Sequence, residues 1–219
     1  MICAIAMAAQ AREQFTDSFA VEKAELTSVG TNRFFVLAPG YQLVLEGEEG
    51  GAPIVLTITV LNETKTVDGV ETRVVEERET ANGRPTEISR NYFAISRRTS
   101  DVFYFGEDVD VYEDGKLVSH EGSWLSGASG AHFGLQMPGT PLLGARYYQE
   151  VAPKVAMDRA EIVDLSEQVE TPAGKFTNCL KTEETSGIEF AREHKFYAPG
   201  IGLVVDGSLR LVRHGRSKQ

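Results

Sequence analysis

Charged side chains recur where the sequence predicts the apolar faces of β-strands. Alternate residues of a strand point to opposite sides, so Phe103 and Phe105 predict an interior face that also carries Glu107. In the run 116–125 the alternation leaves either Glu121 or His120 on the inside. The same counting assigns these further charged residues to interior faces: Glu76, Arg78, Arg192 and His194, with the parity of Glu150 left open.

Charges on an interior face are costly to bury unless they are paired or bound to a metal ion. Carboxylate oxygens and an imidazole nitrogen suit zinc, manganese or calcium. A metal with an open coordination position could activate water to hydrolyse an ester or phosphoester, with Arg78 or Arg192 stabilising the developing negative charge. The candidate metal ligands are Glu76, Glu107, Glu121, Glu150 and His194.

The same residues have a second interpretation that needs no metal. Glu76 with Arg78, and Glu107 with Arg192, could form ion pairs, or the charges could lie at strand ends where the inner face meets solvent. No local spacing in the sequence decides between the two interpretations.

Aromatic side chains on the predicted strands indicate a different use of the interior. A barrel of this kind could hold an apolar or amphipathic small molecule between aromatic walls, as a binding protein without catalysis. We favour this hypothesis over the metal-dependent hydrolase, although aromatic residues at strand spacing also form ordinary cores. The candidate pocket residues are Phe103, Phe105, Trp124 and Tyr147.

Turn-forming dipeptides set out the elements that must position these residues. Asp-Gly at 68–69 and 114–115 and Asn-Gly at 82–83 lie between runs rich in Val, Ile, Thr, Tyr and Phe, which predicts antiparallel hairpins. The Gly- and Ser-rich residues 126–144 predict a long loop without regular structure. The predicted strands are 53–63, 70–80, 85–96, 101–112, 116–125, 145–152, 158–169, 175–185, 187–198, 201–205 and 207–213.

The fold class predicted from these strands is all-β. An antiparallel meander of about 10–11 strands tends to curl into a half-barrel or closed β-barrel, because closure removes exposed edges. A chain of 219 residues is compatible with one such domain, expected over residues 31–214 between an N-terminal segment, 1–30, and a tail, 215–219.

The charge balance restricts the classes of partner. Asp and Glu number 32 against 22 Lys and Arg, which gives a net charge of −10 that repels phosphate backbones. We therefore expect no nucleic-acid partner. No run approaches the roughly 20 apolar residues that span a bilayer, so we expect no transmembrane segment.

The first eleven residues are apolar and small, and they end in Ala-Gln-Ala, a sequence that suits signal peptidase. We interpret them as part of an export signal, which predicts a periplasmic or secreted protein; the alternative is a short N-terminal helix of a cytosolic protein. Cys3 and Cys179 are two isolated thiols and indicate neither a disulfide framework nor a cysteine zinc site.

Several segments together resemble an uncharacterised family of exported bacterial all-β proteins. They are Asn-Arg-Phe-Phe at 32–35 with Ala-Pro-Gly at 38–40, Tyr-Phe-Gly-Glu-Asp at 104–108, Gly-Ser-Trp at 122–124 and Glu-His-Lys-Phe-Tyr-Ala-Pro-Gly-Ile-Gly-Leu-Val at 193–204. The last segment is also similar to one in periplasmic half-barrel proteins of the lipoprotein-carrier type. That resemblance implies export and a curved antiparallel sheet that binds an apolar ligand, and it supplies no catalytic residues.

Overall fold

The computed structural model describes residues 14–190 and 192–216, and nearly all of its regular structure is antiparallel β-sheet. Thirteen strands follow one continuous path in the order β12-β14-β15-β16-β17-β18-β4-β5-β6-β7-β8-β11-β13. The elements are η1 (Lys23–Glu25), β1 (Leu26–Thr27), β2 (Gly30–Thr31), β3 (Val36–Leu37), β4 (Tyr41–Glu49), β5 (Ala52–Val67), β6 (Val70–Ala81), β7 (Arg84–Ser96), β8 (Val102–Glu113), β9 (Lys116–Ser119), β10 (Trp124–Leu125), β11 (His132–Met137), β12 (Arg146–Tyr148), β13 (Glu150–Val151), β14 (Asp158–Thr171), β15 (Gly174–Ser186), β16 (Arg192–Ala198), β17 (Gly202–Asp206) and β18 (Leu209–Arg216).

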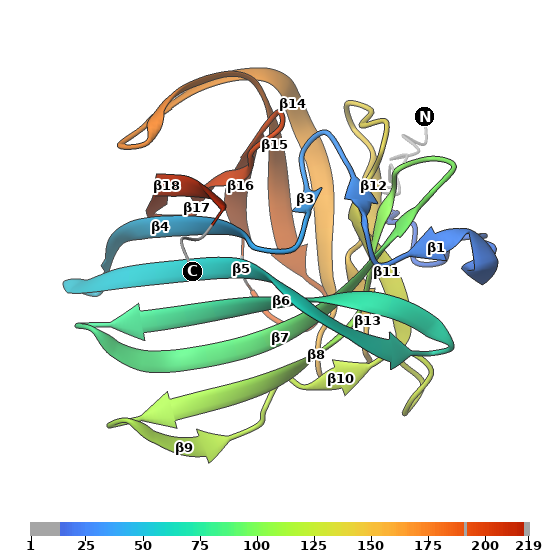
Figure 1. Cartoon of the computed structure of the whole chain (residues 1–219), viewed down its shortest axis with the longest axis horizontal. Coiled ribbons are helices and arrows are strands. Elements are labelled where there is room, and N and C mark those ends of the chain that lie inside the picture. The colour runs from blue at the N-terminus through green and yellow to red at the C-terminus, as the bar shows by residue number, and fades with distance from the viewer. Residues whose placement is uncertain (1–13, 191, 217–219) are drawn as a thin grey trace, which may run out of the picture.

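This sheet curls into a barrel that is closed except at one seam, which confirms the predicted fold class. Figure 1 shows β4 to β8 side by side across the lower part of the molecule, with β14 to β16 rising above them around a common interior. The seam lies between β12 and β13, the two ends of the path, which Gln149 joins directly along the chain. The backbone N–H of Gln149 donates to the carbonyl of Asp158 at 2.8 Å, so β14 lies close to the seam.

The predicted hairpin turns are present, because each dipeptide supplies the two positive φ angles that a tight turn between twisted strands requires. Asp68 and Gly69 have φ angles of 49° and 76°, and the other two dipeptides adopt the same conformation. Strands β5 to β8 match the predicted runs to within a few residues, whereas β9 covers only the first four residues of the run predicted after the third turn. The middle of the sheet is therefore a meander from β4 to β8.

Several strands differ from the prediction. The predicted run 116–125 is divided into β9 and β10, the run 145–152 is divided into β12 and β13, and the run 187–198 forms a strand only from Arg192. Strand β4 lies outside the predicted runs, although it pairs with both β18 and β5 and so joins the two ends of the chain's β-structure. The prediction of a loop without regular structure at 126–144 is wrong, because β11 lies within it and pairs with β8 and β13. Gly134 permits this pairing: a Cβ at that position would lie 2.4 Å from the backbone of Gln149.

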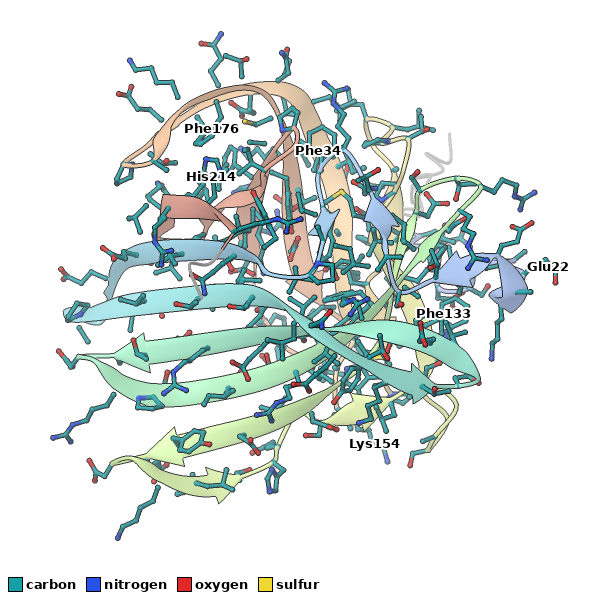
Figure 2. The ribbon with its side chains drawn as sticks, in the orientation of Figure 1. Glu22, Phe34, Phe133, Lys154, Phe176 and His214 are labelled. Carbon is teal, nitrogen blue, oxygen red and sulfur yellow. The ribbon has the colours of Figure 1, made fainter. Side chains whose placement is uncertain are left out.

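An aromatic group packs on the face of β8 and β11 that lies opposite the barrel interior. Phe133, labelled in Figure 2, stacks on Phe105 with ring centroids 4.7 Å apart and meets the edge of Phe103 at 5.7 Å. Phe19 covers this group from the N-terminal segment. These aromatic contacts hold β8 against β11. Other side chains line the middle of the barrel.

Within the described residues, no helix has the length and apolar character needed to cross a membrane. Cys179 is buried and free, and it packs in the apolar cluster formed by β4, β5 and β14 to β18. The predicted export signal and Cys3 lie outside the described residues.

Candidate functional site

Two adjoining cavities lie inside the barrel. The first, which we call the apolar cavity, has a volume of about 90 Å³. The second, the polar cavity, has a volume of about 220 Å³ and opens toward solvent. Four residues, Glu77, Phe93, Gln136 and Lys195, line both cavities, so the two spaces share a wall.

Side chains from four consecutive strands and from the far side of the barrel form the apolar cavity. Strand alternation points Leu43 of β4 and Ile58 of β5 inward, while their sequence neighbours face outward. The apolar and aromatic lining residues are Phe35, Val36, Tyr41, Leu43, Ile58, Val60, Val75, Phe93, Tyr197, Ile201 and Leu203.

Acidic side chains dominate the polar cavity. It is lined by six carboxyl groups and a single cation, Lys195. Glu150 and Glu184 are almost fully enclosed, at 5% and 7% exposure, while Glu87 and Asp158 lie at the open rim. The six carboxyl residues are Glu77, Glu87, Glu107, Glu150, Asp158 and Glu184.

A bulge in β8 places Glu107 in this cavity. The pairing of β7 with β8 shifts by one residue between Tyr104 and Glu107, so both side chains line the polar cavity despite their odd separation. Gly106 makes the bulge possible: its φ is 139°, and a Cβ there would lie 2.4 Å from the carbonyl oxygen of Trp124.

Lys195 organises one side of the polar cavity through ion pairs. Its Nζ lies 3.4 Å from a carboxylate oxygen of Glu184, 3.2 Å from Glu193 and 3.5 Å from Asp206. Burial disfavours the ammonium, but these carboxylates outweigh that effect and raise the pKa of Lys195 well above its ordinary value. Lys195 therefore stays charged and is held by several anions at once.

Hydrogen bonds hold Glu184 in place beside Lys195. Its Oε1 accepts from the hydroxyl of Thr182 at 3.0 Å and from that of Tyr197 at 3.3 Å. Burial raises the pKa of Glu184, and the nearby Lys195 opposes that rise.

Around Glu107 and Glu150 the cavity is acidic, and none of its described lining residues there is a cation. Burial raises the pKa of Glu77 to about 7 although the charge of Lys195 opposes the rise, and burial raises the pKa of Glu107 to about 7 as well; the negative charges of neighbouring carboxylates add to both rises. The pKa of Glu150 lies well above its ordinary value, first because of burial and then because of Asp158 and Glu107. One oxygen of Glu150 accepts the backbone N–H of Asp158 at 3.2 Å.

Some buried polar atoms near the cavity have no hydrogen-bond partner within the described part of the chain. They are Gln149 Oε1, the Tyr147 hydroxyl and Trp124 Nε1. Gln149 lines the polar cavity and is 5% exposed, so its carbonyl oxygen is a buried acceptor beside the six carboxyl groups. Unpaired buried polar atoms are uncommon, because each one loses its hydrogen bonds to water.

The structure brings together only part of the predicted metal set. Glu107 and Glu150 line the polar cavity. Glu76 instead pairs with Arg90 at 3.6 Å on the outer face, and Glu121 is exposed in the turn before β10. His194 is 3.5 Å from Glu183, also outside. Among the described residues, no group of three His, Cys, Asp or Glu side chains is placed to hold a metal ion.

The predicted arginines also face away from the interior. Arg78 is exposed on β6, and Arg192 pairs with Glu183 at 3.0 Å on the outer side of β16. The expected interior position of Arg192 and His194 is wrong, because both side chains are exposed at the start of β16, and the buried residues of this strand are Tyr197 and Ala198 at its other end.

The predicted pocket aromatics are buried but line neither of the two cavities. Phe103 and Phe105 lie on the opposite face of β8 from Tyr104 and pack against Phe133. Trp124 meets Tyr104 edge to face at 5.3 Å and so lies one side chain away from the polar cavity. Tyr147 belongs to the same apolar cluster as these residues.

The sequence reasoning missed Lys195 and Glu77, the two charged residues shared by the cavities. Lys195 follows a usable signal, because it alternates with the buried Tyr197. Glu77 alternates with the buried Val75, but the neighbouring Val74 is buried as well, so the alternation in β6 does not single out Glu77.

A wide hollow beneath the connection from β15 to β16 leads into the polar cavity. It has a volume of about 430 Å³ and shares Asp158, Glu184 and Lys195 with that cavity. Phe190 stands fully exposed at its edge. A small molecule can therefore reach the interior from this end of the barrel.

Comparison with protein-family models gives no matching family, and comparisons with curated proteins and with solved structures give no match. The resemblance to exported all-β proteins stays a prediction, and a function has to be inferred from the geometry of the two cavities.

Proposed function

We propose that the protein binds a small amphipathic molecule inside its barrel. The apolar part of the ligand occupies the apolar cavity, and its polar end occupies the polar cavity. One observation carries this proposal: Glu77, Phe93, Gln136 and Lys195 line both cavities, so one molecule can contact both at once. Pockets that combine apolar walls with a few convergent polar groups are typical binding sites for small molecules.

The size of the apolar cavity limits the ligand. An engineered cavity of about 150 Å³ lined by apolar residues holds benzene. The apolar cavity here measures about 90 Å³. A short or branched alkyl group fits it better than the acyl chains of a lipoprotein.

The polar cavity gives the site its specificity. Its buried carboxyl groups have raised pKa values, with Glu77 and Glu107 at about 7. Groups perturbed in this way gather at functional sites, because ordinary cores avoid buried charge. This observation supports binding rather than a purely structural interior.

The alternative of a metal-dependent hydrolase receives no support from the placement of its residues. Of its five predicted ligands, only Glu107 and Glu150 line the same cavity. The predicted arginines lie on the outer faces of their strands. The predicted export signal would place the binding protein in the periplasm or outside the cell.

Methyl-detected NMR tests the proposal with three probes that share one branched alkyl group: isoamylamine, isoamyl alcohol and isovalerate. Binding of at least one probe at millimolar concentration should shift the methyl signals of Leu43, Ile58 and Leu203, which line the apolar cavity. Ile58→Phe should abolish these shifts by filling the space. Thr57→Phe, on the other face of β5, is the matched control and should retain them.

The absence of saturable shifts with all three probes would contradict the proposed function. Equal loss of binding in Ile58→Phe and Thr57→Phe would also contradict it, because the space inside the barrel would then not be the site.

A further inference from the structure

The charges of the polar cavity are unevenly paired. Lys195 forms ion pairs with Glu184 at 3.4 Å and with Asp206 at 3.5 Å, and both carboxylates lie on its side of the barrel. Within residues 14–190 and 192–216, no Lys, Arg or His forms an ion pair with Glu107 or Glu150. One half of the cavity therefore has its cation, and the other half has none.

The half without a cation also contains an unused acceptor. Gln149 Oε1 is buried, lines the polar cavity and has no hydrogen-bond partner in the described part of the chain. Gln149 precedes Glu150 directly, and Glu150 is close enough to Glu107 for each charge to affect the other. These three acceptor groups thus line the polar cavity together, and no cation of the described residues pairs with them.

We infer that this half of the polar cavity binds the protonated amino group of a small amphipathic amine, between Glu107 and Glu150 and beside Gln149 Oε1. An ammonium group has three donors and no acceptor, which matches two carboxylates and one amide oxygen. Charge-assisted hydrogen bonds of this kind are stronger than neutral ones, especially where water is excluded. The inference rests on the proposed function and narrows its ligand to one chemical class.

The surroundings disfavour the other head groups. A carboxylate or phosphate would face six carboxyl groups and only one cation, which is already engaged by its own ion pairs. A bare inorganic cation would leave the adjoining apolar cavity unused. An amine on a short alkyl group uses both spaces.

Binding of an amine should depend on pH in a definite direction. The ionisable groups that face the cavity are Glu77 of β6, Glu87 of β7, Tyr104 and Glu107 of β8, Glu150 of β13, Asp158 of β14 and Glu184 of β15, with Lys195 of β16 as the cation. Burial and the nearby carboxylates raise the pKa of Tyr104 well above its ordinary value, so Tyr104 stays neutral over this range. As pH rises past about 7, Glu77 and Glu107 lose protons and the cavity becomes more negative. An alkylamine keeps its proton up to about pH 10, so its affinity should rise over this range.

The test compares isoamylamine, isoamyl alcohol and isovalerate by NMR titration at about pH 8.5, which is above the pKa of about 7 of Glu77 and Glu107. The amine should bind at least about tenfold more tightly than the alcohol, and isovalerate should bind most weakly. Glu107→Gln and Glu150→Gln should bring the affinity for the amine down toward that for the alcohol. The affinity for the alcohol itself should change little.

Glu76→Gln is the matched control for charge, because Glu76 is a β6 glutamate that pairs with Arg90 outside the barrel. It should leave the affinity for isoamylamine unchanged. The unmodified protein offers a second measurement that needs no variant: amine affinity should rise from about pH 5.5 to about pH 8.5, while alcohol affinity stays constant.

The outcomes separate the two proposals. Binding of the alcohol as tightly as the amine, or full amine affinity in both Gln variants, would overturn the amine inference and leave the proposed function standing. An amine affinity that does not change with pH would also overturn the inference. Failure of all three probes to bind would overturn both.

Discussion

Glu107→Gln provides a test of the buried charge that does not depend on any ligand. Burial raises the pKa of Glu107 from 4.5 to about 7. One pKa unit corresponds to about 1.4 kcal/mol, so ionising Glu107 costs the folded state about 3 kcal/mol relative to the unfolded chain. Glutamine has nearly the same shape and cannot ionise, so it avoids this cost.

The sign of the effect follows from proton binding. Between pH 4.5 and about 7 the folded protein keeps the Glu107 proton that the unfolded chain has already lost. Stability therefore falls as pH rises through this window, and the full loss is present above it. Glu107→Gln should match the unmodified protein near about pH 4.5 and exceed its free energy of unfolding by about 3 kcal/mol near pH 8.5.

Urea unfolding at the two pH values measures this difference directly. For a domain of this size, about 3 kcal/mol also corresponds to a rise of about 10 °C in Tm near pH 8.5. Glu76→Gln is the control, because it removes only a partly exposed ion pair with Arg90 and should change stability by less than about 1 kcal/mol. An equal effect of Glu107→Gln at both pH values, or a loss of stability near pH 8.5, would refute the reasoning.

Three further changes have expected outcomes that urea unfolding can check. Lys195→Met leaves buried carboxylates without their cation and should cost about 3 kcal/mol or more at neutral pH and less near about pH 4.5; equal loss at both pH values would contradict this. Gly134→Ala places a Cβ 2.4 Å from the backbone of Gln149 and should destabilise the protein by about 2 kcal/mol, whereas an unchanged midpoint would show that this pairing does not constrain the barrel. Replacing His194 by alanine should change stability by less than about 1 kcal/mol and leave isoamylamine binding unchanged, because this side chain is exposed on the outer face of β16; a loss of binding would show that it reaches the site.

The fold could be predicted from sequence because its local signals agree. The dipeptides at 68–69, 82–83 and 114–115 each form the turn that their composition favours, and the strands between them follow. Strand β11 escaped prediction because its pairing depends on Gly134, which appears in the sequence only as another glycine of a flexible region. The sequence of a single strand does not indicate which strands lie at the seam, because the seam is set by how the whole barrel closes.

The site was harder to predict, because the alternation of inward and outward side chains fails in two strands. In one strand adjacent residues are both buried, and in the other a bulge shifts the alternation. Val74 and Val75 are both buried, so the first half of β6 does not reveal which face is interior, and alternation favours Glu76 although Glu77 is the residue that faces inward. In β8 the bulge at Gly106 places the side chains of Phe105 and Glu107 on opposite faces of the strand. Glu107 faces inward as predicted, but it lies on the face opposite the aromatic residues that suggested it.

A few long-range neighbours define the chemistry of the interior. Glu150 and Lys195 come from strands on different sides of the barrel, and nothing in their sequence positions predicts that they line one cavity. Burial and the charges of neighbouring carboxylates shift the pKa of both residues. Both influences arise only when the closed sheet brings distant strands together.

The most direct test of the central claim is to follow the carboxyl-carbon NMR signals of Glu107 and Glu150 during a titration with isoamylamine at about pH 7, near the pKa of Glu107. The account predicts that both signals move toward the ionised form and saturate together with the methyl shifts of the apolar cavity, while the signal of Glu76 stays in place. Unchanged signals of Glu107 and Glu150 at saturating amine, or equal movement of Glu76, would contradict it.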